Sequence, residues 1–374
     1  MSIEKRNGKW MARWRDPDGR QRAKSFPTRQ QAKDHLTHVE SDKLRGVYSA
    51  RRGAPPLAEV ADHWLDASPH LSPVTVKTYR RDLDAYILPT FGKIRADKID
   101  ARAIQRWIST ELKRLAPITV HRHFRTLRTL LGFAQRMGYI AKNPCDDVNA
   151  PKVGRTDVRI LTVDQVNAIA DNINPRYRAL VLLAAYGGLR WGEVVGLRRT
   201  DVDGAKVTVA GQLQNIDGDW VRLEPKWASR RTVVMPASIA VELAAHLDEF
   251  TGPEPGDLVF TNERGAPVGG SFRGNVWGPA CVKAGLATEE WIKPKNRGSR
   301  GRYEYRRRIT GAPRFHDLRH TAASLAIATG AHPKAIQARL GHSTIAMTMD
   351  LYGHLMEGMD AQLAADLDAL RGNT

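Results

Sequence analysis

The 374-residue sequence has only two cysteines, Cys145 and Cys281, and they stand in unrelated contexts. Two isolated cysteines form neither a disulfide framework nor a zinc-binding pattern, so a reducing compartment is expected. No apolar run approaches the length of a membrane span. The first six residues are polar and lack the apolar core of an export signal. We therefore expect a cytoplasmic protein without a membrane partner.

Acidic residues are also scarce, with 40 Asp and Glu against 58 Lys and Arg, for a net charge of +18. The excess is concentrated in two stretches. Residues 1–53 hold 14 basic and 6 acidic residues (+8), and residues 291–308 hold 8 basic and 1 acidic residue (+7). Such clustering predicts a polyanionic partner rather than charge that only keeps the protein in solution. DNA is the favoured polyanion, and an anionic membrane surface is the alternative.

The length of the chain exceeds one ordinary hydrophobic core, so two or three domains are expected. Segments rich in Gly, Pro, Arg and Lys at 46–56 and 151–155 have the composition of linkers. They divide the chain into segments 1–50, 57–150 and 158–374. No internal repeat and no low-complexity tract is evident.

The first segment is predicted to be a small sheet backed by one helix. Residues 9–15 alternate as a strand does, a turn signal follows at 16–19, and residues 20–26 return as another strand. Thr28 begins a capping box for a helix to about Leu44. We expect Trp, Arg and Lys side chains on one exposed face that can lie on a DNA groove, although solvated charges are the simpler alternative. The candidate DNA contacts are Arg13, Arg15, Arg20, Arg22 and Lys24.

The second segment is predicted to be all-helical. Apolar stripes with helical spacing, most of them preceded by a helix-start signal, predict helices over 57–65, 73–87, 100–112 and 119–133. The last of these carries Arg122, Arg125 and Arg128, which are candidate DNA contacts. A solvated polar face is the alternative for these arginines.

The third segment is predicted to be mixed α and β. Strand-like stretches lie at 206–213 and 231–235, and a capping box at Thr162 and Gln165 opens the first helix. The expected helices span about 163–173, 176–187, 190–197, 237–249, 273–284, 316–329, 333–339, 344–354 and 358–371.

One constellation in this segment combines cations, proton carriers and a phenol: Arg190, Lys226, His316, Arg319, His342 and Tyr352. Each residue alone has an ordinary explanation as a surface cation or a packing tyrosine. Together they suit a phosphodiester, because arginines hold non-bridging oxygens, histidine and lysine move protons, and tyrosine can form a covalent phosphoryl-enzyme.

Two neighbours of this constellation need separate interpretation. Glu193 is expected to orient Arg190 or to serve the fold rather than act as a catalytic acid. His320 lies one helical turn after His316, so a two-histidine metal site must be considered. Arg319 would place a cation beside that metal and no third ligand type clusters nearby, so we expect no metal.

The order of these motifs resembles that of the tyrosine recombinases, the phage-type integrases. It runs Gly-Leu-Arg190-x-x-Glu193, Pro-Lys226-x-x-Ser-Arg-Arg, Phe-His316-Asp-Leu-Arg319-His-Thr, Leu-Gly-His342-Ser and Tyr352-x-His354. The resemblance covers residues 160–357 closely. Residues 57–150 look like the core-binding domain of the family, and the N-terminal segment looks like its arm-type DNA-binding domain.

The resemblance implies a multidomain protein, mainly α with α/β parts. The expected parts are a three-stranded sheet with one helix, an all-helical core-binding domain, and a mixed α+β catalytic domain. Two features depart from the family pattern. Trp227 replaces a small polar residue after the lysine, and the basic stretch 287–312 is longer than usual, as a partly mobile loop over DNA would be.

The resemblance also implies a mechanism. Tyr352 would attack one DNA strand and form a 3′-phosphotyrosyl bond while Arg190 and Arg319 clamp the phosphate. Lys226 would protonate the leaving 5′-oxygen, His316 would assist proton transfer from the tyrosine, and His342 would hydrogen-bond the phosphate. Because bond energy is retained, no cofactor is needed, and a clamp made of cations needs no metal.

The implied partners are double-stranded DNA at attachment sites, three further copies of the chain in a homotetramer, a host DNA-bending protein and an excisionase. The final helix carries an apolar stripe that we expect to pack on a neighbouring protomer: Leu363, Ala364, Leu367 and Leu370. The expected function is integration and excision of a phage or mobile element. Alternatives are an inactive DNA-binding regulator, or a recombinase for chromosome-dimer resolution or transposition. A metal-dependent nuclease would need clustered carboxylates.

Overall fold

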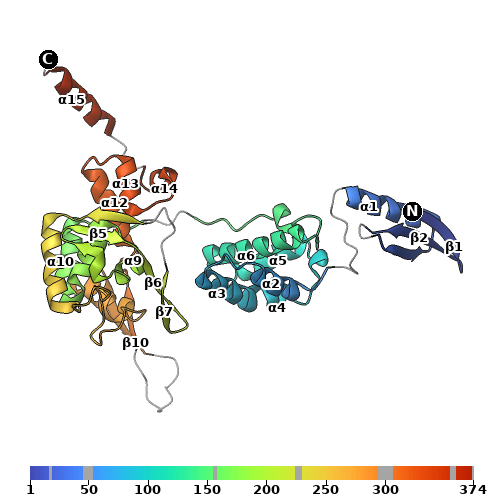
Figure 1. Ribbon diagram of the computed structural model, residues 1–374, viewed down its shortest axis with the longest axis horizontal. Helices are drawn as coiled ribbons and strands as arrows, with labels where there is room; N and C mark the ends of the chain where they lie inside the picture. Colours follow the sequence, from blue (N-terminus) through green and yellow to red (C-terminus); the bar gives the residue numbers. More distant parts are fainter. Residues whose placement is uncertain are drawn as a thin grey trace, which may run out of the picture. The chain divides into compact units, whose positions relative to one another are not determined.

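The computed structural model forms two compact units, residues 1–155 and 156–374, which are considered separately (Figure 1). The structure describes residues 1–16, 19–44, 54–154, 158–223, 230–293, 306–353 and 359–372. No helix in these parts of the chain is both long and apolar enough to cross a membrane.

The N-terminal part is an antiparallel sheet of three strands with one helix, as expected. Its elements are β1 (Ser2–Arg6), β2 (Lys9–Arg15), β3 (Gln21–Phe26) and α1 (Arg29–Leu44). Ala12 of β2 packs with Ala32 and Leu36 of α1 in a small core of its own.

Contrary to expectation, the tryptophans of this sheet lie on the face that packs against the helix, and Arg22 and Lys24 of β3 lie opposite Trp14 and Ala12 on that same face. Trp10 and Trp14 alternate with Arg13 along β2, and both rings pack against the core under α1. Successive strand residues point to opposite faces, so Arg13 and Arg15 lie on the face away from the helix. The tryptophans serve the packing of this sheet rather than its open surface.

Helices and short helical turns form the rest of the first unit. They are α2 (Leu57–Asp66), α3 (Pro73–Asp82), η1 (Leu83–Ile87), α4 (Leu88–Phe91), η2 (Ala96–Lys98), α5 (Ala101–Glu111), α6 (Pro117–Arg136) and η3 (Pro144–Asp147). Ser72 and Asp100 cap α3 and α5 through their side chains, as the sequence predicts. The last long helix begins two residues before its expected start at Thr119, because Pro117 is suited to the first helical position.

The second unit combines helices with small antiparallel sheets. Its helices are α7 (Val163–Asn172), η4 (Pro175–Tyr177), α8 (Arg178–Gly187), α9 (Trp191–Val195), η5 (Arg199–Asp201), α10 (Ala237–Phe250), η7 (Arg273–Trp277), α11 (Gly278–Lys283), α12 (Asp317–Ala328), α13 (Pro333–Leu340), α14 (Ile345–Tyr352) and α15 (Met359–Gly372). Its strands are β4 (Val202–Asp203), β5 (Lys206–Val209), β6 (Gln212–Ile216), β7 (Asp219–Leu223), β8 (Arg231–Val234), β9 (Thr288–Ile292) and β10 (Arg306–Thr310).

Three of the strands pair in the order β4-β5-β8, and two separate hairpins accompany this sheet. The strand expected over 206–213 is divided between β5 and β6, and β7 was not expected. The expectation of a loop at 287–312 is also wrong at both of its ends, because β9 and β10 pair there as an antiparallel ribbon.

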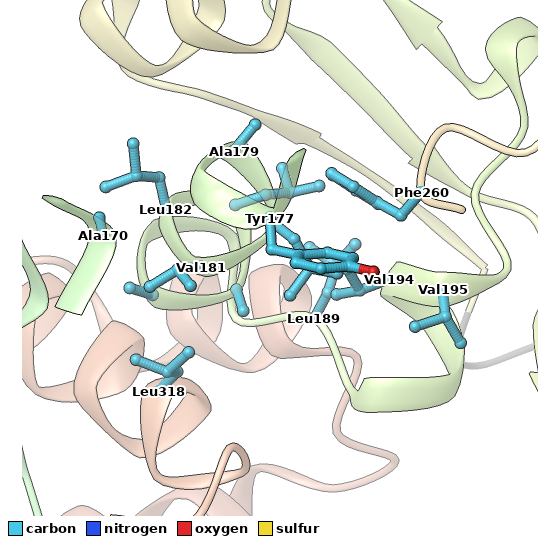
Figure 2. Close-up of a cluster of buried hydrophobic side chains, with 14 of the residues drawn as sticks. Ala170, Tyr177, Ala179, Val181, Leu182, Leu189, Val194, Val195, Phe260 and Leu318 are labelled. Atoms are coloured by element: carbon cyan, nitrogen blue, oxygen red, sulfur yellow. The ribbon is translucent and has the colours of Figure 1, made fainter. Parts of the chain in front are cut away.

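Helix α8 lies within the core of the second unit, with every side chain from Ala179 to Ala185 buried. Figure 2 shows Tyr177, Val194 and Phe260 gathered on one side of this helix, and Leu318 of α12 below Val181 in the view. A helix that is apolar all round needs cover on all sides. The C-terminal end of α8 at Gly187 is therefore held in place, and Arg190 follows three residues later in the chain.

We expect Gly188→Ala to destabilise the second unit more than Gly330→Ala. Both glycines have φ near +70° (68° and 74°), but a Cβ on Gly188 would lie 2.5 Å from Leu340 Cδ2 and 3.3 Å from Ala322 Cβ. No atom lies within 4 Å of a Cβ on Gly330. Gly330→Ala should cost about 1 kcal/mol for backbone strain, and Gly188→Ala roughly 1–3 kcal/mol more for overpacking. Urea unfolding of both variants gives the comparison, and equal losses would contradict it.

Candidate active site

Three arginines converge on the C-terminal end of α13. Arg231 Nε donates to the carbonyl oxygen of Arg339 (2.7 Å), Arg319 Nη2 to that of Leu340 (2.6 Å), and Arg190 Nη2 to that of Gly341 (3.3 Å). These are consecutive carbonyls at a helix end, where backbone acceptors lack helical partners and the helix dipole is negative. The end of one helix thus brings together three guanidinium groups from distant parts of the sequence.

Glu193 is the carboxylate that two of these arginines share. Its Oε1 accepts from Arg190 Nη1 (2.8 Å) and its Oε2 from Arg231 Nη2 (2.8 Å). Burial alone would raise the pKa of Glu193, but the hydrogen bonds and charges of Arg231 and Arg190 outweigh it and lower that pKa. Glu193 is therefore ionised, and it orients Arg190, as the sequence indicates.

Arg319 lacks such a partner. It is only 3% exposed, donates to the carbonyls of Leu340 and Gly188, and forms no ion pair among the described residues. Burial, followed by the charges of Arg190 and Arg231, lowers the pKa of Arg319 to about 9. The site therefore holds a positive charge that the surrounding described side chains do not neutralise.

The helix starts explain why these side chains meet. Arg190 is the N-cap of α9, with its own backbone N–H bonded to Glu193 (2.9 Å). His316 is the N-cap of α12, so Arg319 lies in the first turn of that helix, three residues on. Arg190 keeps 35% of its side chain exposed, which leaves it open to a ligand.

The histidines of the site are held in their neutral form. Burial, and then the charge of Arg319, lowers the pKa of both His316 and His342, and that of His342 to about 4. His342 Nδ1 bonds the hydroxyl of Thr348 (2.9 Å), so its Nε2 remains for another partner. Neutral imidazoles can accept or relay a proton near neutral pH.

Tyr352 is buried rather than presented to the arginines. It is 1% exposed and packs with Ile327, Ile336 and Leu340. Its hydroxyl bonds His320 Nδ1 at 2.6 Å. Burial raises the pKa of Tyr352 to about 12, although the charge of Arg319 opposes the rise.

The structure thus brings five of the six expected site residues into one part of the second unit, and Lys226 lies outside the described residues. The sequence did not predict Arg231 as a residue of the site, and it suggested His320 only as a metal ligand. A signal for His320 existed, since it is one helical turn from His316, with the two rings 5.1 Å apart. Nothing in the sequence marks Arg231 apart from neighbouring basic residues.

The candidate DNA contacts outside this site differ in whether their side chains form ion pairs with described carboxylates. Arg13, Arg22 and Arg128 pair with Glu4, Asp16 and Asp146, and Arg122 pairs with the fully buried Asp82 at 3.1 Å. Arg15, Arg20, Lys24 and Arg125 are exposed. The buried pair makes Arg122 at least partly a structural residue of the helical part.

Family comparisons cover most of the chain. Residues 159–358 match the phage integrase family, and residues 57–112 match the phage integrase N-terminal SAM-like domain. The putative prophage phiRv2 integrase of Mycobacterium tuberculosis is 28% identical over 385 residues, covering 98% of this chain and 94% of the relative. The integrase of Mycobacterium phage L5 is 28% identical over 322 residues, covering 84% of this chain and 79% of the relative.

Solved structures share the fold. The Tn1549 transposon integrase in complex with a circular intermediate DNA matches with a TM-score of 0.66 at 20% identity, over 84% of this chain and 99% of that one. A lambda integrase tetramer bound to a Holliday junction matches with a TM-score of 0.57 at 18% identity, over 93% of this chain and 94% of that one.

The site should make the stability of the second unit depend on pH. Burial lowers the pKa of His320 and of His342 to about 4. The unfolded chain therefore binds more protons than the folded one between about pH 6.5 and 4. Stability is full above pH 6.5 and falls through this window, by on the order of 1–2 kcal/mol per histidine at pH 5.

His320→Asn should lower the slope of unfolding free energy against pH by roughly one proton. Hydrogen exchange of the α8 and α12 amides, corrected for intrinsic rates, reports on this unit. His63→Asn, at an exposed position of α2, is the control. An unchanged slope in His320→Asn would contradict the assignment of a depressed pKa.

Proposed function

Because the chain belongs to the phage integrase family and is a site-specific recombinase of the tyrosine type, we propose that Tyr352 is its nucleophile and that Arg190 and Arg319 bind the scissile phosphate. The observation that carries this proposal is the buried Arg319, which has no ion pair among the described residues and is held beside Arg190 at the end of α13. A buried guanidinium is stable only when its charge is compensated, and a phosphate supplies that charge with matching geometry.

Negative charge at the phosphorus increases during the reaction. A phosphodiester carries one negative charge, and attack by a phenolate adds another at phosphorus. Fixed guanidinium groups stabilise the additional charge without reorganising. The two arginines are already oriented by Glu193 and by backbone carbonyls, which makes the clamp pre-organised.

The proposed step conserves atoms and protons. The Tyr352 oxygen bonds phosphorus while the bond from phosphorus to the 5′-oxygen breaks, giving a 3′-phosphotyrosine and a 5′-hydroxyl. The phenol proton passes to neutral His316, and Lys226 protonates the leaving oxygen. His342 donates to a phosphate oxygen. The reverse step, with the same or a partner 5′-hydroxyl, rejoins the strand without a cofactor.

Tyr352 must leave its buried position before it can react. The bond to His320 and the contacts with Ile336 and Leu340 hold its hydroxyl away from solvent, where its raised pKa opposes ionisation. Exposure beside Arg190 and Arg319 would lower that pKa, because opposite charges favour the phenolate. We infer that the described conformation precedes cleavage and that binding to DNA or to a second protomer releases α14.

The remaining parts of the chain have proposed roles in DNA binding. Residues 1–50 form an arm-type DNA-binding domain, residues 57–150 a core-binding domain, and residues 158–374 the catalytic domain. The open face of the N-terminal sheet, with Arg13 and Arg15, supports the first role. We propose that the substrate is an attachment site on double-stranded DNA, bound by a homotetramer in the cytoplasm, with a host DNA-bending protein and an excisionase as accessory partners.

The final helix supports the assembly of protomers. Leu367 and Leu370 of α15 are 56% and 72% exposed. The same unit has a cavity of about 600 Å³ lined largely by alanines and aliphatic residues of α12 and α13. We propose that α15 of one protomer packs its leucines on this surface of the next, which would join protomers in a ring.

Tyr352→Phe should abolish a covalent protein–DNA adduct while leaving DNA binding intact, because only the nucleophilic oxygen is removed. The assay uses nicked suicide duplexes built from DNA flanking the gene, in EDTA, and detects adducts that survive denaturation. Tyr177→Phe, another buried tyrosine of the same unit, should retain the adduct.

Three outcomes would count against this proposal. An adduct that survives Tyr352→Phe would identify another nucleophile. Loss of the native adduct in EDTA would indicate a metal-dependent reaction. Tight binding with neither adduct nor relaxation of supercoiled DNA would favour an inactive regulator.

Leu367→Asp combined with Leu370→Asp should weaken tetramer formation on DNA at least about tenfold, since buried leucines each contribute on the order of 2 kcal/mol. Binding of one protomer to one half-site should change little. Sedimentation of the protein–DNA complexes separates the two effects. Val241→Asp, at a 70% exposed position of α10, is the matched control. Equal loss of assembly and of half-site binding would overturn the exchange of α15.

A further inference from the structure

The β9–β10 ribbon is an element that the proposed chemistry does not use. Its strands pair antiparallel from Thr288–Thr310 to Ile292–Arg306 and join no other described strand. The base of the ribbon is anchored. Ile309 packs on Gly278, where an added Cβ would lie 2.9 Å from Ile309 Cδ1, and Arg307 Nη2 donates to the carbonyl of Gly274 at 2.7 Å. The anchored strands extend from the body of the unit as a defined surface.

Large side chains on this ribbon are left open. Trp291 is 64% exposed and lies opposite Arg307, while Ile292 is 38% exposed and lies opposite Arg306. Opposed residues of an antiparallel pair share a face, so each face combines an apolar group with a guanidinium. Exposed aromatic and aliphatic residues gathered on one small element indicate a binding surface.

The charge of the ribbon selects the kind of partner. Arg306, Arg307 and Arg308 are all exposed. Arg308 lies 3.6 Å from Glu290, but both side chains are more than half exposed (62% and 57%), so this pair is weak. Arg306 has no ion pair among the described residues. With a sequence charge of +7 over residues 291–308, the partner is expected to be a polyanion.

Two cavities that share Arg273 extend from the ribbon toward the start of α9. Arg307 and Arg273 line one cavity of about 430 Å³. Arg273 also lines a second cavity of about 340 Å³ together with Arg314 and Trp191, the residue that follows Arg190. The two cavities also share Gly270 and Trp277, so the three arginines lie along one hollowed part of the unit between the ribbon and Trp191.

We propose that the β9–β10 ribbon is a second DNA-binding element of the catalytic unit, which enters the major groove of the duplex next to the scissile phosphate. A two-stranded ribbon has the width that this groove admits. Trp291 makes apolar contact with the bases from one face of the ribbon. Arg306 and Arg308 lie on the opposite face, from which their long side chains reach backbone phosphates at the groove edges. The inference rests on the proposed function, because it takes the duplex cleaved by Tyr352 as the ligand.

The test compares the full-length protein with Arg306→Ala/Arg308→Ala and with Trp291→Ala, on a duplex carrying the core site. The double variant should bind about tenfold more weakly, and the slope of log K against log salt should fall by roughly two, one for each phosphate contact. Arg306→Lys/Arg308→Lys should restore most of the binding. Arg264→Ala, an exposed arginine elsewhere in the unit, should have no effect.

Dimethyl sulfate reacts with guanine N7 and so reports on the major groove. Native protein should protect guanines beside the core site, and Trp291→Ala and the double alanine variant should lose that protection. At saturating protein these variants should still form the Tyr352 adduct, so a failure of the ribbon is distinct from a failure of the catalytic proposal.

Two results would overturn the ribbon's role. One is unchanged affinity, salt slope and guanine protection in the variants. The other is normal binding of single protomers with loss of the tetramer, which would make the ribbon a contact between copies of the chain.

Discussion

The site depends on one constraint, the need to satisfy three consecutive carbonyls at the end of α13. Arg231, Arg319 and Arg190 bond the carbonyls of Arg339, Leu340 and Gly341 in turn. Like charges repel, so three guanidinium groups gather only where the backbone supplies fixed acceptors and a negative helix end. The turn that follows needs a left-handed residue, and Gly341 provides it with φ of 64°. A side chain there would collide with Arg231, since its Cβ would lie 2.8 Å from Nη1.

Much of the architecture could be predicted from local signals. The caps at Ser72, Asp100 and Thr162 state where helices begin, and the structure shows each of these bonds. The members of the site could be selected because their chemistry is unusual in combination and because their order resembles that of a known family. Local capping and residue chemistry are both properties of short stretches, and a sequence displays them directly.

The rest depended on contacts between distant stretches. The tryptophans of the N-terminal sheet were expected on an exposed face, because tryptophans among arginines are typical of a DNA-binding surface. Only the packing of α1 over Trp10 and Trp14 shows that these side chains belong to the core. The β9–β10 ribbon was missed because its strands carry charges rather than an apolar alternation. The role of Arg231 could not be predicted from the sequence, since its partners Glu193 and Arg339 are 38 and 108 residues away.

The proposed phosphate clamp and the proposed nucleophile are positioned to different degrees before DNA binds. Arg190 and Arg319 are fixed before any phosphate arrives, whereas Tyr352 is stored under Ile336 and Leu340 with its hydroxyl on His320. Leu340 belongs to both arrangements, since its carbonyl holds Arg319 and its side chain packs with the tyrosine. A displacement of the end of α13 therefore acts on clamp and nucleophile together. In an enzyme that conserves bond energy, cleavage by an isolated protomer would leave a broken strand. If Tyr352 is the nucleophile, as proposed, its burial would limit that reaction to assembled complexes.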